Sequence, residues 1–388
     1  MSRPLRLAVI AGEESGDLLA ADAVQALKAM TGGPVELVGV GGHNLEAQGL
    51  KSLFDPAEIA LMGLSAVVRE LPRLIRRIGQ TARHVIEMKP DCLLTVDSPD
   101  FGLRVARKVR AAAPAVPIVH YVCPSVWAWR PDRAAAMKPY VDHILCLLPF
   151  EPAELDRLKG PPGTFVGHRL VHEPGLVAAA AAQKQRPPPG TDETRTLLVL
   201  PGSRRSEVKR LLEPFRETVE ILRGRGMKLR LVLPTVPHVR ATVEAAAAGW
   251  AERPEIVTDA EGKWRAFGQA DAALCASGTV SLELALAGVP LLSCYRLDPI
   301  ARSLTFLLTA WSASLPNLIA DRPVAPEFYN DQVRPNHLAH WIEALLSDTE
   351  LRRWQLAGFA EVRRRLSTQR PAGEIAAEVI LKAVGSRQ

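Results

Sequence analysis

Short apolar runs alternate with longer stretches of mixed polarity along the first half of the chain. The apolar runs predict strands near 5–11, 35–40, 92–97, 116–122, 143–148 and 164–167. The stretches between them, such as 17–30, 68–88 and 102–112, have a helical or loop pattern. Alternation of buried strands with helices is typical of a parallel, doubly wound sheet, so we expect an α/β fold.

The second half of the chain repeats this pattern. Strands are predicted near 196–200, 228–233, 254–258, 271–275 and 289–294, and helices near 206–224, 239–249 and 279–287. These elements predict a second Rossmann-like unit. From 336 to 385 apolar positions such as Leu338, Ile342 and Leu345 recur at helical spacing. We expect this tail to cover one or both sheets.

The stretch between the two halves has a different composition. An alanine-rich segment leads into RPPPGTDET, which favours a linker that does not pack into a core. The predicted organisation is an N-terminal Rossmann-like domain over 1–173, a linker over 174–195, a second Rossmann-like domain over 196–335 and C-terminal helices over 336–388. We expect the two domains to face each other across a cleft that could hold a phosphate-bearing donor and its acceptor.

Length, charge and cysteine content limit the number of domains, the location of the protein and the kinds of ligand that it could bind. A chain of 388 residues fits two domains of roughly 150–200 residues each. No apolar run approaches the ~20 residues of a membrane-spanning helix and no secretory signal is recognisable, so we expect a cytoplasmic protein. The net charge of +6 favours phosphorylated substrates or an anionic membrane surface, and nucleic acid least, because no nucleic-acid-reading motif is present. The five cysteines lack metal-ligand spacing and are interpreted as buried apolar residues.

Each half opens with a strand that runs into a glycine-bearing turn, LRLAVIAGEESGD in the first and TLLVLPGSRRSEV in the second. Backbone N–H groups and a helix N-terminus at this place favour phosphate or diphosphate. In the first turn Gly12, Glu13, Ser15 and Gly16 are candidate substrate-binding residues, and the alternative is a plain helix start capped by Ser15 or Asp17. The full G-x-G-x-x-G pattern is absent, so we expect no nicotinamide cofactor.

A polar cluster follows the strand predicted over 92–97, at the sheet edge where catalytic groups are exposed. A hydroxyl acceptor that attacks an activated sugar must lose its proton, and a carboxylate can take it. Asp97 is our candidate general base, with Asp100 as the second candidate. The alternative is that Asp100 caps the following helix while Asp97 braces the turn.

The PGSR turn of the second half offers Ser203 and Arg204. Arginine suits bidentate phosphate recognition and can stabilise the charge of a departing diphosphate. The alternative is a solvated basic turn in which Ser206 caps the helix.

A second turn of this half, in CASGTVSLE, opens a helix with Ser277, Gly278 and Thr279. The backbone amides there can hold phosphate oxygens. Glu283, one turn further, can accept hydrogen bonds from ribose hydroxyls, or it belongs to a local cap. Asn317 in SLPNLIADR is either a site amide or a turn-former.

The segment HYVCPSVWAWRPDR places Trp127 and Trp129 beside Arg130 and Arg133. Such aromatic clusters are more often core or interface anchors than ligand contacts, and the proline favours a loop. His168, at a strand end near the predicted hinge, is a secondary candidate.

Taken together, the motifs occur in the order and spacing of the lipid-A-disaccharide synthase family. They are AGEESGD, GVGGHNLEAQGL, ALMGLSAVV, VDSPDFGLR, YVCPSVWAWR, LLPFE, FVGH, LPGSRRSEV, ASGTVSLE and SLPNLIADR. The resemblance spans about 5–330. It implies a GT-B-type glycosyltransferase that moves 2,3-diacylglucosamine, with inversion, from UDP-2,3-diacylglucosamine to 2,3-diacylglucosamine 1-phosphate (lipid X). The products would be the β-1,6-linked lipid A disaccharide 1-phosphate and UDP.

The resemblance also implies roles for matching residues. Asp97 would be the base, and the UDP contacts would be Arg204, Ser277, Gly278, Thr279, Glu283 and Asn317. It implies no metal and no cofactor, because amides, helix dipoles and arginine can neutralise the leaving diphosphate. Glu14, Ser98, Cys123 and Arg169 depart from the usual family pattern beside motif residues, which bears on acceptor preference more than on the reaction. A homodimer is compatible with the chain.

Acylated substrates further predict a membrane-facing surface. Residues 57–78 combine apolar side chains with four arginines, as in a segment that lies on an anionic bilayer. Arg302 and residues 303–311 form a second candidate, and the alternative is two ordinary amphipathic core helices. Two rival functions stay open: a UDP-sugar epimerase of related architecture, and a two-domain protein that binds a sugar without chemistry.

Overall fold

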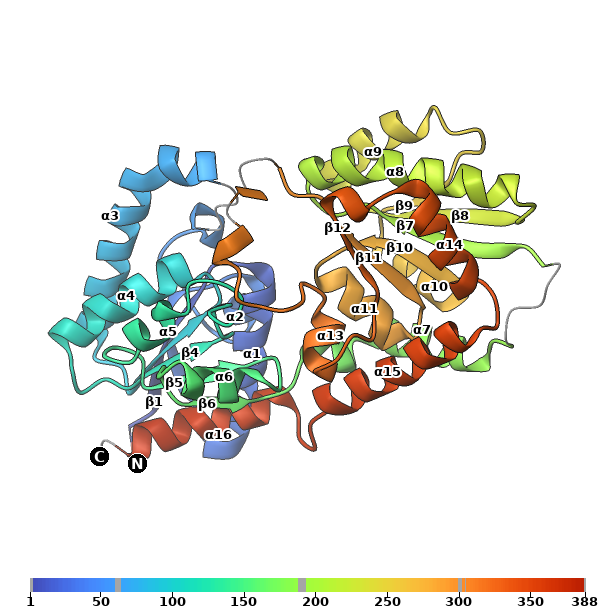
Figure 1. Ribbon diagram of the computed structural model, residues 1–388. Helices are drawn as coiled ribbons and strands as arrows, with labels where there is room; N and C mark the ends of the chain where they lie inside the picture. The colour runs from blue at the N-terminus through green and yellow to red at the C-terminus, as the bar shows by residue number, and fades with distance from the viewer. Residues whose placement is uncertain (1–2, 60–63, 188–192, 299–301, 304, 387–388) are drawn as a thin grey trace. The chain divides into compact units, whose positions relative to one another are not determined.

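The computed structural model describes residues 3–59, 64–187, 193–298, 302–303 and 305–386. The chain forms two compact units, each built on its own six-stranded parallel sheet (Figure 1). Unit 1 comprises residues 1–168, 307–309 and 368–388, and unit 2 comprises residues 169–306 and 310–367. The predicted α/β class with two Rossmann-like sheets is confirmed.

The sheet of unit 1 has the strand order β2-β1-β3-β4-β5-β6. Its strands are β1 (Leu5–Ala11), β2 (Val35–Val40), β3 (Cys92–Val96), β4 (Ile118–Tyr121), β5 (His143–Cys146) and β6 (Gly163–Phe165). Ala11 pairs with Val96, and Val96 pairs with Tyr121. The carboxyl ends of the three central strands therefore meet at one edge, and the turns that follow them are neighbours.

Helices cover both faces of this sheet. They are α1 (Glu14–Thr31), α2 (His43–Ala47), α3 (Leu64–Met88), α4 (Pro99–Ala112), α5 (Asp132–Met137), α6 (Glu151–Arg157) and α16 (Ala372–Gly385). One face packs against α1 and α16, through residues such as Val24 and Ile380. The other packs against α3 and α4, through residues such as Ile78 and Val105.

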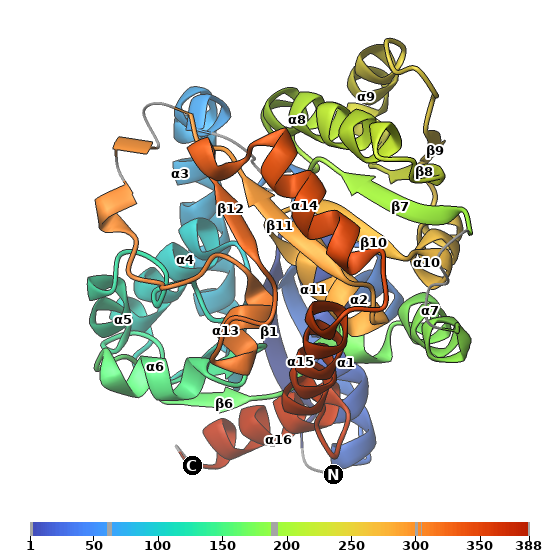
Figure 2. The ribbon, with the colours of Figure 1, turned by 45° about the vertical axis from the view of Figure 1, so that its right-hand side comes forward.

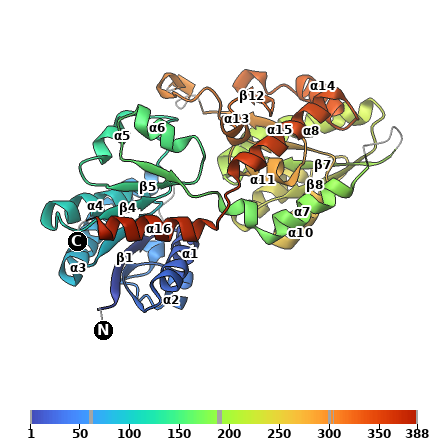
Figure 3. The same cartoon turned by 90° about the horizontal axis from the view of Figure 1, so that it is seen from below.

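The C-terminal helix α16 lies directly on α1 (Figure 3). Gly373 makes this approach possible, because a Cβ there would stand 2.7 Å from the carbonyl oxygen of Asp22. The tail thus covers both sheets, as expected: α14 and α15 belong to unit 2, and α16 belongs to unit 1.

The sheet of unit 2 has the order β12-β11-β10-β7-β8-β9. Its strands are β7 (Arg195–Leu200), β8 (Leu229–Pro234), β9 (Glu255–Val257), β10 (Ala272–Ala276), β11 (Leu291–Tyr295) and β12 (Glu327–Tyr329). The two central strands, β7 and β10, pair over Leu197–Leu200 and Ala272–Cys275. Their carboxyl ends point to the same edge.

The helices of unit 2 also form two layers (Figure 2). They are α7 (Pro174–Gln185), α8 (Arg205–Gly224), α9 (Arg240–Ala247), α10 (Ala260–Gln269), α11 (Thr279–Ala287), α13 (Leu315–Ala320), α14 (Pro335–Leu345) and α15 (Glu350–Leu366). Residues such as Phe215 of α8, Val243 of α9 and Ile342 of α14 share one core with the sheet. Helix α7 packs against α10 and α11, and α15 packs against α11. Five 3-10 turns complete the described chain: Pro56–Glu58, Arg169–His172, Pro237–Val239, Thr305–Leu307 and Asn330–Gln332.

The interpretation of 174–195 as an unpacked linker is wrong for its first part. Residues Pro174–Gln185 form the helix α7 of unit 2, with Leu176, Ala179 and Ala180 buried. Alanine is the best helix former, and its small side chain lets helices approach closely. Residues 188–192 of the predicted linker lie outside the described residues.

Several short elements were not predicted. Strand β12 and helices α5, α6 and α13 have three to seven residues each, too few to establish a period. The prediction for the cysteines is confirmed, since all five are buried with free thiols. Within the described part of the chain, every helix is too short or too polar to span a lipid bilayer.

Candidate active site

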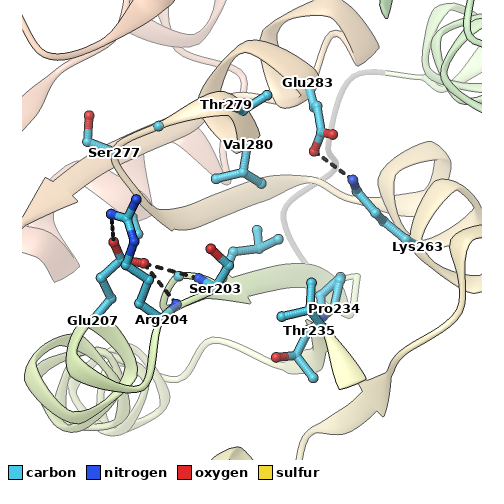
Figure 4. A pocket seen from close by; sticks show the side chains of 15 residues that line it. Ser203, Arg204, Glu207, Pro234, Thr235, Lys263, Ser277, Thr279, Val280 and Glu283 are labelled. Carbon is cyan, nitrogen blue, oxygen red and sulfur yellow. Dashed lines mark hydrogen bonds and ion pairs between the residues drawn. The ribbon is translucent and has the colours of Figure 1, made fainter. Parts of the chain in front are cut away.

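A cavity of about 330 Å³ lies at the carboxyl edge of the sheet of unit 2 (Figure 4). Its walls come from the turn after β7, the end of β8, one side chain of α10 and the turn between β10 and α11. The lining residues are Leu200, Gly202, Ser203, Arg204, Glu207, Pro234, Thr235, Val236, Lys263, Ala276, Ser277, Gly278, Thr279, Val280 and Glu283. Six of the predicted binding residues therefore meet in one place: Ser203, Arg204, Ser277, Gly278, Thr279 and Glu283.

In the turn between β7 and α8, the backbone N–H groups are already hydrogen-bonded to a glutamate of the following helix. Glu207 accepts hydrogen bonds from the backbone N–H groups of Ser203 at 3.1 Å and Arg204 at 3.2 Å. It also forms an ion pair of 2.9 Å with the Arg204 guanidinium. Gly202 has φ of 112°, and a Cβ there would overlap the Glu207 carboxylate. Arg204 is the N-cap residue, so the alternative in which Ser206 caps this helix is wrong.

In the turn between β10 and α11, by contrast, no side chain caps the start of the helix. Gly278 is the N-cap residue, with φ of 147° and no side chain that could cap the helix. The Ser277 hydroxyl points elsewhere, because it donates to the carbonyl of Ala313 at 2.9 Å. The first turn of α11, with Thr279 and Val280, therefore presents backbone N–H groups and the positive helix end to the cavity.

An ion pair marks the far wall of the cavity. The Lys263 ammonium lies 2.7 Å from the Glu283 carboxylate, whose side chain is 13% exposed. The same ammonium stands 4.3 Å from the centre of the Trp264 ring. Glu283 was predicted, whereas Lys263 was not, because nothing local in the α10 sequence indicates that it faces a residue twenty positions away.

The structure does not bring Asn317 to this cavity. Asn317 is 1% exposed, and its amide nitrogen donates to the Ala325 carbonyl and to Glu327, both at 2.9 Å. Its oxygen accepts from the backbone N–H groups of Val324 and Ala325, both at 2.7 Å. Every polar atom of this amide is therefore engaged in holding the segment before β12, which is the turn-forming alternative.

In unit 1 the candidate base follows β3 in a constrained turn. Asp97 and Ser98 have φ of 49° and 39°, in the left-handed region. The Asp97 carboxylate accepts from the backbone N–H of Ser98 at 2.9 Å, and the Asp97 N–H donates to the Tyr121 carbonyl at 2.9 Å. Burial raises the pKa of the Asp97 carboxyl, although the Ser98 hydrogen bond opposes this.

Asp100 has a different environment from Asp97. Its side chain is 77% exposed and forms an ion pair of 3.2 Å with Arg133. It lies inside the first turn of α4, whose N-cap residue is Ser98, so the alternative that Asp100 caps this helix is wrong.

The turn between β1 and α1 faces the turn that carries Asp97. A Cβ on Gly12 would lie 3.2 Å from the Ser98 hydroxyl, and one on Gly16 would lie 3.6 Å from the Asp97 Cβ. Burial raises the pKa of Glu13, and the charge of Asp97 raises it further. The candidates Gly12, Glu13 and Gly16 are thus brought together with Asp97, the candidate base.

Ser15 and Asp17, which also belong to this segment, do not cap the helix. Ser15 is exposed in the first turn of α1, whose N-cap residue is Glu13, so neither Ser15 nor Asp17 caps this helix. Asp17 is 3% exposed and instead accepts from the N–H groups of Gly42 at 2.6 Å and Asn44 at 2.7 Å, at the start of α2.

The structure also places the histidines and the aromatic loop that were considered from the sequence. His120 and His143 lie in strands β4 and β5. Burial lowers the pKa of His168 to about 4, so this side chain is neutral at neutral pH. Residues 123–131 form a loop, as predicted, in which Trp129 is 45% exposed.

Comparison with solved structures shows the type of fold. The chain superposes on MurG of Acinetobacter baumannii with a TM-score of 0.56 and 16% identity, over 98% of this chain and 100% of the other. The glycosyltransferase of kitacinnamycin gives a TM-score of 0.61 at 15% identity, over 98% and 99%. UDP-GlcNAc 2-epimerase from Neisseria meningitidis, bound to UDP-GlcNAc, gives 0.59 at 12% identity, over 98% and 100%. The fold is that of the GT-B glycosyltransferases.

Sequence relatives narrow the class to one family. The profile of lipid-A-disaccharide synthetase matches residues 7–379. Lipid-A-disaccharide synthases of Nitrobacter hamburgensis and Rhodopseudomonas palustris strain HaA2 are 45% and 46% identical, each over 98% of this chain and 96% of the relative. That of Rhodospirillum centenum is 41% identical over 99% and 96%. The chain belongs to the lipid-A-disaccharide synthase family, and it is a glycosyltransferase of lipid A biosynthesis. These relatives give no support to the epimerase alternative.

Proposed function

We propose that Asp97 and the cavity of unit 2 divide the chemistry of transfer from UDP-2,3-diacylglucosamine to lipid X. The observation that carries this proposal is the open N-terminus of α11 in a cavity that Arg204 and Glu283 also line. A diphosphate oxygen can accept from the N–H groups of Thr279 and Val280, where the helix dipole favours negative charge. Glu283 can accept from ribose hydroxyls, and the Lys263 ammonium pairs with its carboxylate.

Arg204 would act on the leaving group. When the sugar departs, negative charge grows on the UDP diphosphate, and a guanidinium stabilises it best if the arginine is already positioned. Glu207 supplies that positioning through its ion pair with Arg204. The helix dipole and this arginine supply positive charge without requiring a metal ion.

Asp97 would remove the proton from the acceptor hydroxyl as this oxygen attacks the sugar carbon. A buried carboxylate with a raised pKa holds a proton more readily than an exposed one, which helps a base for a weakly acidic hydroxyl. Asp100 suits this role less well, because it is exposed and paired with Arg133. A single displacement inverts the sugar carbon and needs no covalent intermediate.

The test is UDP release from UDP-2,3-diacylglucosamine with and without lipid X, in the native protein and in two matched variants. Acceptor-dependent release should fall by about 10²–10⁴ in Asp97→Asn, the usual contribution of a general base, and by less than about threefold in Asp100→Asn. Release that ignores lipid X would contradict the transfer reaction. Full activity in Asp97→Asn, or collapse in Asp100→Asn alone, would move the base away from Asp97.

We also propose peripheral association with an anionic membrane surface. Residues 305–311 do not form a core helix: Phe306 and Trp311 are 77% and 55% exposed. In the other predicted segment, Ile75 on α3 of unit 1 is 56% exposed, and residues 60–63 lie outside the described residues. Exposed apolar side chains beside arginines suit the boundary between headgroups and acyl chains.

Cosedimentation with vesicles that contain anionic phospholipid tests this association. Phe306→Ser with Trp311→Ser should lower the bound fraction severalfold, because each removes a large apolar group from the bilayer boundary. Val177→Ser is the matched control, since Val177 is also apolar and 45% exposed but lies on α7. Equal loss in the control, or no binding of the native protein at low salt, would contradict the proposal.

A further inference from the structure

The buried carboxylate of Glu151 has no role in the chemistry described so far. Glu151 begins α6 and is 3% exposed. Among the residues that the structure describes, no cation lies within ion-pair distance of it, and a carboxylate oxygen lies within 4.8 Å of the buried thiols of Cys123 and Cys146. Burial without a counter-ion raises the pKa of Glu151 to about 7. An unpaired buried carboxyl is costly, which indicates that its hydrogen bonds serve a purpose.

Those hydrogen bonds lead to the loop 123–131. One oxygen of Glu151 accepts from the indole N–H of Trp127 at 3.2 Å, and the other accepts from the backbone N–H of Leu148 at 3.0 Å. The Trp127 ring also packs edge-on against Phe150, with ring centres 5.1 Å apart. Trp127 is thus fixed from two sides by the segment that starts α6.

The loop in turn holds a distant piece of chain. The backbone N–H of Thr309 donates to the Ala128 carbonyl at 2.9 Å, and the Thr309 hydroxyl donates to the Trp127 carbonyl at 2.9 Å. Trp129 and Leu308 form an antiparallel bridge. We call the resulting pair of segments, residues 127–130 and 307–309, the ribbon. It lies wholly within unit 1.

Both ends of the loop are tied to the segment that carries the proposed base. Before the loop, the Tyr121 carbonyl accepts the N–H of Asp97. After it, Arg133 pairs with Asp100. Val122, just before the loop, and Arg130, within it, have φ of 75° and 55°. A β-branched residue such as Val122 adopts this region only when its surroundings impose it. The loop is therefore a fixed structure beside Asp97.

The outer surface of the ribbon is apolar. Trp129, Leu307 and Leu308 are 45%, 48% and 56% exposed, and the Arg130 guanidinium lies 4.9 Å from the centre of a Trp129 ring. Apolar side chains with an adjacent cation suit an acyl chain that is joined to an anionic head. The acceptor of the proposed reaction has this chemistry, because lipid X carries acyl chains and a phosphate.

We propose that Glu151 is a positioning residue for the lipid acceptor: by holding Trp127 it fixes the ribbon, and the ribbon receives an acyl chain of lipid X. This inference rests on the proposed function and deepens it. Glu151 touches neither substrate, and its effect reaches the acceptor through Trp127 and the ribbon. Loss of its hydrogen bond should therefore change acceptor binding before it changes donor binding or the chemical step.

The test is a set of steady-state kinetics in which each substrate is varied in turn. In Glu151→Gln and in Trp127→Phe the KM for lipid X should rise about threefold to tenfold, the cost of one lost hydrogen bond. The KM for the UDP donor and kcat should stay within about twofold of native. The double variant should behave like either single variant, because both remove the same contact. A lipid X analogue with short acyl chains should show no such rise.

Thr309→Val tests the role of the ribbon independently, in case Glu151→Gln and Trp127→Phe do not fold. It removes only the hydroxyl that holds the Trp127 carbonyl, at an exposed position, and should raise the KM for lipid X about twofold to threefold. Thr305→Val is the matched control, since its hydroxyl donates to the Arg302 carbonyl outside the ribbon.

Three results would overturn the inference while native turnover stays intact. They are a parallel change of both KM values and kcat, an unchanged KM for lipid X in folded variants, and equal behaviour of the two threonine variants. Absence of lipid X-dependent UDP release by the native protein would instead contradict the proposed function itself.

Discussion

Replacing Glu207 by alanine should loosen the start of α8 and the wall of the cavity together. The variant removes the acceptor of two backbone N–H groups and the partner of the Arg204 guanidinium. Ser203 and Arg204 are exposed, so water can replace the lost carboxylate. The cost should therefore be that of a lost helix cap, about 1–2 kcal/mol of unfolding free energy. For a unit of this size that corresponds to a fall in Tm of about 2–8 °C.

The same change should weaken UDP binding by about threefold to tenfold, because Arg204 must then be ordered when the ligand arrives. Scanning calorimetry gives Tm, and titration calorimetry gives the Kd for UDP. Glu213→Ala is the matched control on the same helix, since Glu213 is 60% exposed in a surface pair with Arg216 and should cost less than about 1 kcal/mol. Equal losses in the two variants, or an unchanged Tm and Kd in Glu207→Ala, would refute the assigned role of Glu207.

Three further predictions concern single side chains. The proposed base, Asp97, acts only when ionised, so kcat/KM should fall as the pH drops through a pKa above that of an exposed aspartate. Glu13→Gln removes a neighbouring negative charge and should move this acid limb to lower pH. An unmoved pH–rate profile would show that Glu13 does not influence the pKa of Asp97. Asn317→Ala should lower the unfolding free energy by about 2–4 kcal/mol, since it leaves buried backbone groups unpaired, and a loss of UDP affinity at unchanged Tm would show a direct contact instead. Glu283→Gln should weaken UDP binding by about threefold to tenfold in titration calorimetry, because a neutral amide is a weaker acceptor than a carboxylate; an unchanged Kd would remove Glu283 from the ribose site.

The long elements could be predicted because each leaves a strong periodic signal. Runs such as Leu5–Ala11 and Ala272–Ala276 are buried on both faces of a parallel sheet, and so they appear as continuous apolar stretches. The alanine-rich segment of α7 resembles a linker in composition, because alanine and proline are common in linkers too. What distinguishes α7 is its packing against α10, where Gly175 lies against the Trp264 ring, and this contact is not encoded locally.

Site residues that follow the ends of strands could be predicted from the sequence. Residues that reach their partners only through tertiary contacts could not. Asp97 and Ser277 come directly after a strand, and parallel strands bring such positions to one edge of the sheet. Lys263 and Glu151 reach their partners only after folding: Lys263 meets Glu283 from another helix, and Glu151 meets Trp127 across 24 positions. Nothing in their local sequences distinguishes them from ordinary surface or helix-start charges.

The electrostatics of the turns explain why similar sequences serve different ends. Glycines at strand ends predict an anion site at both opening turns. Whether such a turn can bind an anion also depends on the charged side chains next to it. In unit 2 the start of α8 already holds the carboxylate of Glu207, whereas the start of α11 has only Gly278 there, so a diphosphate is better accommodated at α11. In unit 1 the carboxyls of Glu13 and Asp97 lie together at the turn, where they repel an anion and attract the proton of a hydroxyl. A neutral acceptor hydroxyl at unit 1 and a charged leaving group at unit 2 are therefore what these two edges favour.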